Sequence, residues 1–183
     1  MKFDSPDAVE ILPAGEEHLE SLASLAVVIW RQYYPSIISW AQIDYMLAGM
    51  YAPETLRADL AHREIRFFRL LVAGRFVGFA SLGPASAAQV MKLHKLYLLP
   101  EFHGRGLGRR LLQYCEAEAC RLGARRLLLC VNKRNLRALQ VYQQSGFIIA
   151  ESITVNIGGG FVMDDFLMTK DLPTVGDPTL RCL

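Results

Sequence analysis

Residues 96–112 read LYLLPEFHGRGLGRRLL, and they carry three successive patterns of secondary structure. The apolar run up to Leu99 is typical of a strand, and Pro100 ends it. A turn follows, with glycines at 104, 106 and 108. A helix comes next, because apolar residues recur at helical spacing: Leu107, Leu111, Cys115, Ala119 and Leu122. The stretch therefore predicts a strand that passes through a glycine turn into a helix.

A turn of this kind is suited to holding an anion. The first N–H groups of a helix have no partner within the helix, and the helix dipole makes that end partly positive. Glycine lets the backbone approach a phosphate closely, and Arg105, Arg109 and Arg110 add positive charge. The glycine spacing fits neither the dinucleotide-binding fingerprint nor the Walker motif. From these residues alone, a diphosphate site of another class and a flexible turn without a ligand both stay open.

The rest of the chain predicts one mixed α/β domain. Helical periodicity begins after Glu16, at Ile38 and after Pro53, and it returns over residues 132–145. Strand-like runs cover residues 9–12, 65–72, 76–82, 89–99, 126–131, 147–155 and 161–169. This order places helices around a single sheet. We expect one domain over residues 1–172 and a loosely held tail over residues 173–183.

Composition and charge narrow the class of protein. The chain has 183 residues, of which 52% are hydrophobic and 21% charged, as in globular domains. Residues 101–137 hold nine Lys or Arg against three Asp or Glu, and the remainder holds eleven against fifteen. That division suits an anionic cofactor and a cationic substrate, although a solvated helix face is the alternative. The basic stretch lacks the interleaved aromatic residues of a nucleic-acid platform, so no nucleic-acid partner is expected.

Other features exclude a metal site and a membrane segment. The spacing of the cysteines does not match a zinc site, and no metal is expected: they are Cys115, Cys120, Cys130 and Cys182. The first residues, MKFDSPDAVEILPAGEE, are too acidic for a signal peptide. No apolar run reaches the length of a membrane span. We therefore expect a reduced, cytoplasmic protein without a membrane partner.

Residues 135–147 read NLRALQVYQQSGF and form a second pattern, on the last predicted helix. Asn135 and Tyr142 are separated by about 700° around a helix, so they share a face, and the small Ala138 lies on the same side. The Asn135 amide is able both to donate and to accept hydrogen bonds. The alternatives are an ordinary helix-start residue for Asn135 and a packed aromatic residue for Tyr142.

Together the two stretches resemble the GNAT superfamily of acetyl-CoA-dependent N-acetyltransferases. His103-x-x-Gly106-x-Gly108 is similar to the family's coenzyme A signature Q/R-x-x-G-x-G/A, with His103 as a departure at the first position. Residues 135–147 are similar to N-x-x-A-x-x-x-Y-x-x-x-G-F. The resemblance implies an α/β fold with one mixed, mostly antiparallel, twisted sheet of about seven strands. Helices would cover both faces, and a parallel, splayed pair of strands would lie at the centre.

The resemblance also implies acetyl-CoA as the cofactor and indicates the residues that hold it. The pantetheine arm would pair like an added strand with the backbone of Leu96 and Leu98. The diphosphate would lie on the glycine turn. The implied cofactor-binding residues are Leu96, Tyr97, Leu98, His103, Gly104, Arg105, Gly106, Leu107, Gly108, Arg109, Asn135, Ala138 and Tyr142.

The implied reaction is direct transfer of the acetyl group to a primary amine of a small molecule, polyamine or peptide, within a ternary complex. Tyr142 would act as general acid toward the departing thiolate, and His94 as the base that deprotonates the amine. His94 is otherwise a partly buried sheet residue. The expected acceptor-binding residues, each otherwise a surface residue, are Tyr33, Asp44, Tyr45 and Asp164, with Asp165 as a further candidate.

Three other functions stay open at this point. A non-catalytic acetyl-CoA sensor would keep the glycine turn without needing Tyr142. An acyltransferase would use another acyl-CoA or act on a hydroxyl. A nucleic-acid binder would use the Arg-rich stretch 105–137. The resemblance implies a homodimer, and neither it nor the residues identify the acceptor amine.

Overall fold

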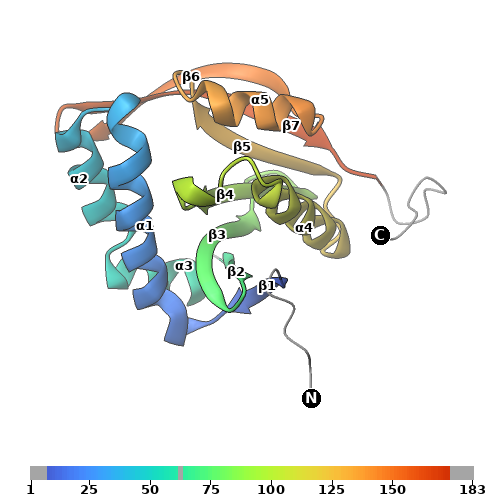
Figure 1. The fold of residues 1–183 in the computed structure, drawn as a ribbon. Helices are drawn as coiled ribbons and strands as arrows, with labels where there is room; N and C mark the ends of the chain where they lie inside the picture. The colour runs from blue at the N-terminus through green and yellow to red at the C-terminus, as the bar shows by residue number, and fades with distance from the viewer. Residues whose placement is uncertain (1–7, 62–63, 174–183) are drawn as a thin grey trace.

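The computed structural model describes residues 8–61 and 64–173 of the chain. Within these residues, seven strands and five α-helices follow one another (Figure 1). The strands are β1 (Val9–Ala14), β2 (Arg66–Val72), β3 (Arg75–Pro84), β4 (Val90–Leu98), β5 (Arg126–Asn132), β6 (Ile148–Gly158) and β7 (Phe161–Asp171). The helices are α1 (Leu19–Tyr33), α2 (Trp40–Met50), α3 (Pro53–Ala61), α4 (Leu107–Arg121) and α5 (Leu136–Gln144).

The described strands form one sheet in the order β1-β2-β3-β4-β5-β7-β6. Each neighbouring pair is antiparallel except β4 and β5, which run parallel in the middle of the sheet. A mixed, mostly antiparallel sheet with a central parallel pair was predicted, and it is confirmed. The parallel pair is joined through α4, which supplies the long crossover that parallel neighbours require.

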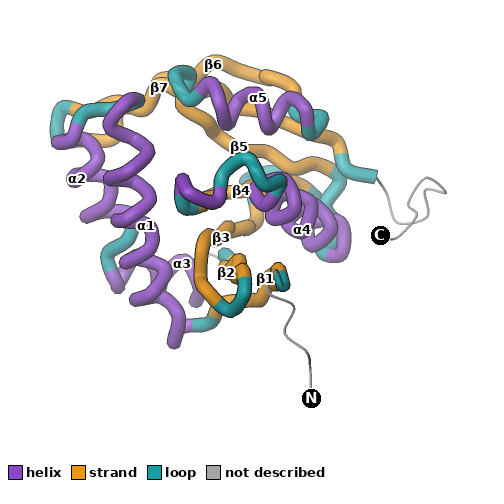
Figure 2. Tube along the Cα trace, in the orientation of Figure 1, coloured by secondary structure: helices purple, strands orange, loops and turns teal. Residues whose placement is uncertain are grey.

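Helices cover both faces of the sheet, with α1–α3 on one side and α4 and α5 on the other (Figures 1 and 2). β2 shows how the sequence assigns these faces, because successive side chains of a strand point to opposite sides. Phe67 faces Lys95, which pairs with Asp59 of α3. Phe68 meets Tyr114 of α4, with ring centroids 5.1 Å apart. Both phenylalanines are buried, so apolar core lies on each side of the sheet.

The two parallel strands pair over only part of their length. Val90–Leu93 of β4 lies opposite Arg126–Leu129 of β5, and the two strands diverge beyond that point. The divergence begins at a β-bulge. On β3, Ser81 pairs with Lys95 and Leu82 with Leu93, which leaves His94 as the extra residue. Because a bulge bends the strand that carries it, the bulge at His94 explains why β4 leaves β5 there.

Element boundaries differ from the prediction at the last helix. It was expected from Asn132, but Asn132 ends β5 and α5 begins at Leu136. The Asn135 side chain caps this helix by accepting a hydrogen bond from the Ala138 N–H group at 3.2 Å. Apart from Pro173, the predicted tail over 173–183 lies outside the described residues. In the described ranges, none of the helices is both long enough and apolar enough to cross a membrane.

Candidate active site

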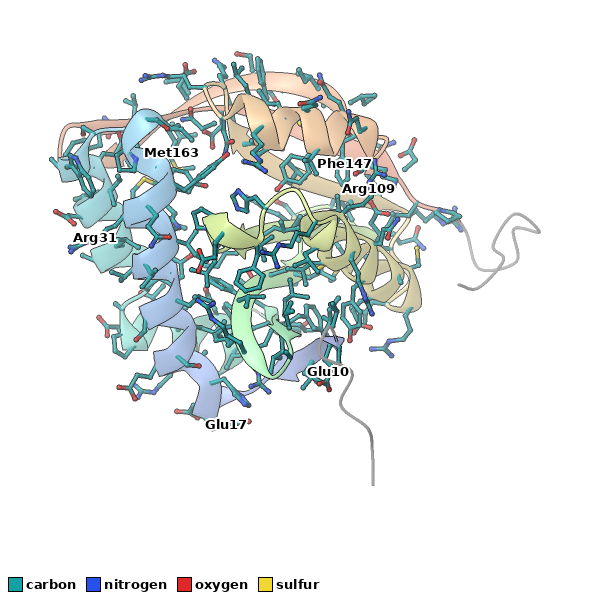
Figure 3. All side chains as sticks on the ribbon, in the orientation of Figure 1. Glu10, Glu17, Arg31, Arg109, Phe147 and Met163 are labelled. Atoms are coloured by element: carbon teal, nitrogen blue, oxygen red, sulfur yellow. The ribbon has the colours of Figure 1, made fainter. Side chains whose placement is uncertain are left out.

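Two cavities meet where β4 and β5 diverge. The first, of about 260 Å³, lies between the strands β4, β5 and β7 and the helices α1 and α2. The second, of about 380 Å³, lies between α1, the glycine turn and α5. Figure 3 labels Met163 of the first cavity and Arg109 of the second. Six residues line both cavities: Tyr34, Leu96, Tyr97, Asn135, Ala138 and Tyr142.

The glycine turn forms one wall of the second cavity. Gly104 and Gly106 have φ values of 79° and 73°, in the left-handed region that favours glycine. Gly106 precedes α4, and the first N–H group to find a partner in the helix is that of Arg110, which donates to the Gly106 carbonyl. A Cβ atom at Gly108 would meet no atom within 4 Å, so the first turn of α4 faces open space. Free N–H groups beside such space fit a diphosphate.

The arginines around this turn divide by role. Arg109 lines the second cavity, together with Arg137 of α5. Arg105 instead lies over the ring of Phe102, with its guanidinium carbon 5.0 Å from the ring centroid. Arg110 donates to the Val9 carbonyl oxygen at 3.1 Å. Of the three arginines in the predicted anion site, only Arg109 lines the cavity.

The diverging strands expose backbone groups to the gap between them. The Leu99 N–H group donates to the Val77 carbonyl on β3. Because alternate residues of an antiparallel strand face the same neighbour, Leu96 and Leu98 turn their backbone groups away from β3, toward the gap. On β5, the backbone N–H group of Lys133 donates to the Asp164 carbonyl on β7. By the same alternation, the backbone groups of Cys130 and Asn132 face the gap from the other side. An amide-containing chain fits between these two edges.

His103 lines the second cavity, and its side chain contacts the end of β4. Its Nε2 atom lies 2.9 Å from the Leu98 carbonyl oxygen, so the Nε2–H group donates to that oxygen. Burial lowers the pKa of His103, and the Arg137 charge acts in the same direction. A carbonyl oxygen has two lone pairs, so the Leu98 oxygen is able to accept a second hydrogen bond.

Asn135 joins α5 to α1 in the wall of the second cavity. Its Oδ1 atom caps α5 and also accepts a hydrogen bond of 2.8 Å from the hydroxyl of Tyr33. The side-chain oxygen is therefore used within the protein, and the amide nitrogen is the group left to donate to a ligand. Tyr33 was predicted on the acceptor side, but it lines the second cavity, beside His103.

Tyr142 lies at the junction of the two cavities. It is on the buried face of α5, only 9% exposed, and its ring packs edge-on against Phe147 with centroids 5.8 Å apart. Burial raises the pKa of Tyr142 well above its ordinary value. The phenol therefore keeps its proton at neutral pH, at a point reached from both cavities.

The polar groups of the first cavity come mainly from one face of β4, β5 and β7. His94 lies there at the bulge, with Lys92 on the same strand. Asp165 of β7 is cross-strand partner to Asn132 and is only 3% exposed. Burial, joined by the Asp164 charge, raises the pKa of Asp165, although Asn132 and the lysines at 92 and 133 act in the opposite direction.

Three residues expected at the acceptor site line neither cavity. Asp44 is exposed and pairs with Arg31 at 3.1 Å. The Tyr45 hydroxyl donates to the Ile157 carbonyl at 2.7 Å, so this side chain fastens α2 to the β6–β7 hairpin. Asp164 is exposed and pairs with Lys133. Asp164 points away because alternate side chains of β7 face opposite sides of the sheet, and Asp44 because it lies about 200° around α2 from Met46. Tyr45 lies nearer the cavity-facing side of α2, but its hydrogen bond directs it to the hairpin.

Sequence reasoning missed the residues of α2 that do line the first cavity. Gln42, Met46 and Met50 follow one another at four-residue spacing and face it together. That spacing is visible in the sequence, but it is equally typical of a helix face in an apolar core. Gln42 also ties α2 to β7, because its Nε2 group donates to the Val162 carbonyl at 2.7 Å.

Residues 23–147 match the model of the acetyltransferase (GNAT) family. An uncharacterised N-acetyltransferase of Mycobacterium bovis is 38% identical over 99 residues, which cover 54% of this chain and 62% of that protein. A spermidine N(1)-acetyltransferase of Thermoplasma acidophilum is 26% identical over 86% of this chain and 96% of its own length. Thus the match with the mycobacterial relative spans less than two thirds of that protein.

Solved structures share the fold. A PaiA N-acetyltransferase from Thermoplasma acidophilum, in complex with coenzyme A, superposes with a TM-score of 0.76 at 26% identity, over 90% of this chain and 99% of that one. The ribosomal-protein-S18-alanine N-acetyltransferase of Escherichia coli superposes with a TM-score of 0.69 at 19% identity, over 93% and 98% of the two chains. Because its identity is only 19%, the Escherichia coli structure shows a shared fold and no more.

Proposed function

Because this chain belongs to the acetyltransferase (GNAT) family, we propose that it transfers an acetyl group from acetyl-CoA to a primary amine, by direct attack while both are bound. One observation carries the proposal: two cavities of different character share six lining residues at the divergence of β4 and β5. The second cavity suits the cofactor and the first the amine. Their junction is then the place where the amine nitrogen meets the acetyl group.

The second cavity has the donors that coenzyme A needs. The N–H groups at the start of α4, with Arg109, bind the diphosphate. The backbone of Leu96 and Leu98 pairs with the amides of the pantetheine arm, and the Asn135 amide nitrogen donates to the same arm. Bound in this way, acetyl-CoA supplies an activated acetyl thioester at the junction. The coenzyme A complex of the Thermoplasma structure supports this assignment.

Tyr142 acts as the general acid in this proposal. Its hydroxyl keeps its proton at neutral pH because burial raises the pKa. When the amine nitrogen bonds to the acetyl carbon and the carbon–sulfur bond breaks, the phenol donates its proton to the thiolate that leaves. A proton donor at a junction shared by both cavities is correctly placed for a group that departs between them.

His94 acts as the base. An alkylammonium has a pKa near 10.4, so it must lose a proton before its nitrogen attacks. His94 lines the first cavity, where the proposal places the amine, and a neutral imidazole accepts a proton directly or through one water molecule. The acceptor is a primary amine, and the relationship to a spermidine acetyltransferase supports the inclusion of small polyamines.

The homodimer also stays a prediction. β6 is an edge strand of the sheet, and it exposes apolar side chains, with Ile148 at 68% and Val155 at 48%. Sedimentation of the purified chain at several concentrations would test it. A single species with the mass of one chain at all of them would contradict the expectation.

The test of the activity is thiol release from acetyl-CoA with a panel of amines, amino acids and short peptides. Tyr142→Phe removes only the hydroxyl, and Tyr114→Phe makes the same change on α4, outside both cavities. We expect amine-dependent release that falls by about 10²-fold or more in Tyr142→Phe and little in Tyr114→Phe. Release that is unchanged in Tyr142→Phe would exclude Tyr142 as the acid. Binding of acetyl-CoA without release for any amine would favour the sensor.

A further inference from the structure

Asp165 is the single carboxylate among the described residues that line the two cavities. It is only 3% exposed, and none of the residues in the described ranges forms an ion pair with it. A buried carboxylate without an ion-pair partner is costly for the folded protein. The Asn132 side chain and the charges of the lysines at 92 and 133 offset part of that cost. A cation that enters the cavity would offset more of it, so the group is suited to binding one.

The strand that carries Asp165 aims it at the cavity. Successive side chains on β7 point to opposite faces of the sheet, and Asp164 points outward to Lys133. Asp165 therefore lies on the face of α1 and α2, opposite Asn132 on β5. Gln42 holds α2 against β7 at the Val162 carbonyl, close to this position along the strand. The carboxylate is thus fixed in the wall of the first cavity.

The location of Asp165 within the site separates it from the reacting centre. The six residues that line both cavities mark the junction, and Asp165 is not among them. It lines the first cavity alone. His94, the proposed base, also lines the first cavity alone, but it lies on β4, and β5 stands between β4 and β7 in the sheet. A cationic group bound at Asp165 is therefore at a different strand from the one that carries the base for the reacting amine.

We propose that Asp165 binds the distal ammonium group of a diamine whose other amino group is acetylated. Apolar side chains of the same cavity, Ile38, Met46, Met50 and Met163, would cover the methylene chain between the two nitrogens. This inference rests on the proposed function, and it adds the substrate class and the residue that selects it.

Lys92 raises the question of whether the distal group of the substrate is an ammonium group, as in a diamine, or a carboxylate, as in an amino acid. It lines the same cavity and would attract a carboxylate, as an amino acid substrate requires. The carboxylate of such a substrate would, however, enter a cavity that already holds the buried carboxylate of Asp165. Like charges at close range in a poorly solvated site repel strongly. Lys92 would in turn repel a second ammonium group, but its side chain is more exposed than that of Asp165, so water screens its charge more strongly. The more deeply buried charge, that of Asp165, therefore favours a second ammonium group over a carboxylate.

The experiment compares three acceptors of equal chain length: 1,4-diaminobutane, 1-aminobutane and 4-aminobutanoate. Initial rates of thiol release give kcat/KM for each with the wild type, Asp165→Asn and Asp171→Asn. Asp171 lies on the same strand but is exposed and pairs with Arg126, so Asp171→Asn is a matched control. A series of α,ω-diaminoalkanes then tests whether the site fixes the distance between the two nitrogens.

We expect the wild type to prefer the diamine to the monoamine by about tenfold or more in kcat/KM, the effect of one charge-assisted hydrogen bond. Asp165→Asn should abolish that preference, mainly by raising KM for the diamine. The control should keep the preference. Because Asp165 has no ion-pair partner in the described ranges, a neutral amide at this position removes a desolvation cost, and thermal unfolding would confirm that the variant folds.

Two results would overturn the inference and separate it from the proposed function. If the wild type uses 1-aminobutane or 4-aminobutanoate as well as the diamine, Asp165 does not select a diamine, but the acetyltransferase activity stands. If no amine in a broad panel releases thiol, the proposed function fails and this inference fails with it. The wild-type comparison alone gives either result, whatever the stability of the variant.

Discussion

The hydroxyl of Tyr33, at the end of α1, donates a hydrogen bond of 2.8 Å to Oδ1 of Asn135, at the start of α5. The two residues are 102 positions apart in the chain. Their contact lies in the wall of the second cavity and joins α1 to the helix that carries Tyr142. Asn135 therefore has a structural role in addition to any contact with a ligand.

The first prediction concerns this contact. Tyr33→Phe should lower the free energy of unfolding by about 1 kcal/mol, because it leaves the Asn135 oxygen with one hydrogen bond fewer. Asn135→Ala should cost about 1–2 kcal/mol, because it also removes the cap of α5. A double-mutant cycle in urea would measure the coupling. Strict additivity of the two changes would show that the contact contributes nothing in solution.

Two glycines of the turn should respond differently to alanine. Gly106 has a φ of 73°, so Gly106→Ala should lower the free energy of unfolding by about 1–2 kcal/mol. Gly108 lies in α4 with open space beside it, so Gly108→Ala should leave stability unchanged or slightly improved. The same methyl group would occupy the space in which the diphosphate is proposed to lie.

Calorimetric titration with coenzyme A tests whether the methyl group of Gly108→Ala occupies the space proposed for the diphosphate. Gly108→Ala should weaken binding by about tenfold or more while thermal unfolding stays the same. Binding as tight as in the wild type would show that the diphosphate lies elsewhere.

The buried ion pair of Lys95 and Asp59 should be expensive to break. Their charged atoms lie 3.5 Å apart with side chains only 7% and 5% exposed. Asp59→Ala leaves the Lys95 charge buried with less compensation and should cost about 3–5 kcal/mol. The double change Lys95→Met with Asp59→Leu should recover much of that loss. A double variant less stable than Asp59→Ala would contradict this account.

His103 should make stability depend on pH. Burial lowers its pKa in the folded protein, so the unfolded chain binds a proton more readily. The contribution of neutral His103 to stability is fully present above the pKa of the unfolded chain, about 6.5. It is lost as the pH falls through the lower pKa of the folded protein. The free energy of unfolding should therefore drop from pH 7 toward pH 5 more steeply in the wild type than in His103→Asn. Equal slopes would show that His103 is not the group responsible.

The sequence was sufficient for the features that depend on local periodicity. The glycine turn at the start of α4 follows from the strand before it and the helical spacing after it. Asn135 and Tyr142 share a face of α5 because they are seven residues apart on a helix, and the structure places both at the junction of the cavities. The mixed sheet follows from the order of the elements together with the family resemblance.

The identity of the side chains that enter the cavities depends on tertiary packing and could not be predicted from local spacing. Asp164 and Asp165 are neighbours in the chain, and the pairing of β7 with β5 determines that Asp165 faces the cavity while Asp164 faces outward. The packing of α1 determines that Tyr33 lies in the second cavity. The physical reason is that local spacing fixes which residues share a face, whereas strand register and helix docking, set by contacts distant in sequence, fix what that face meets.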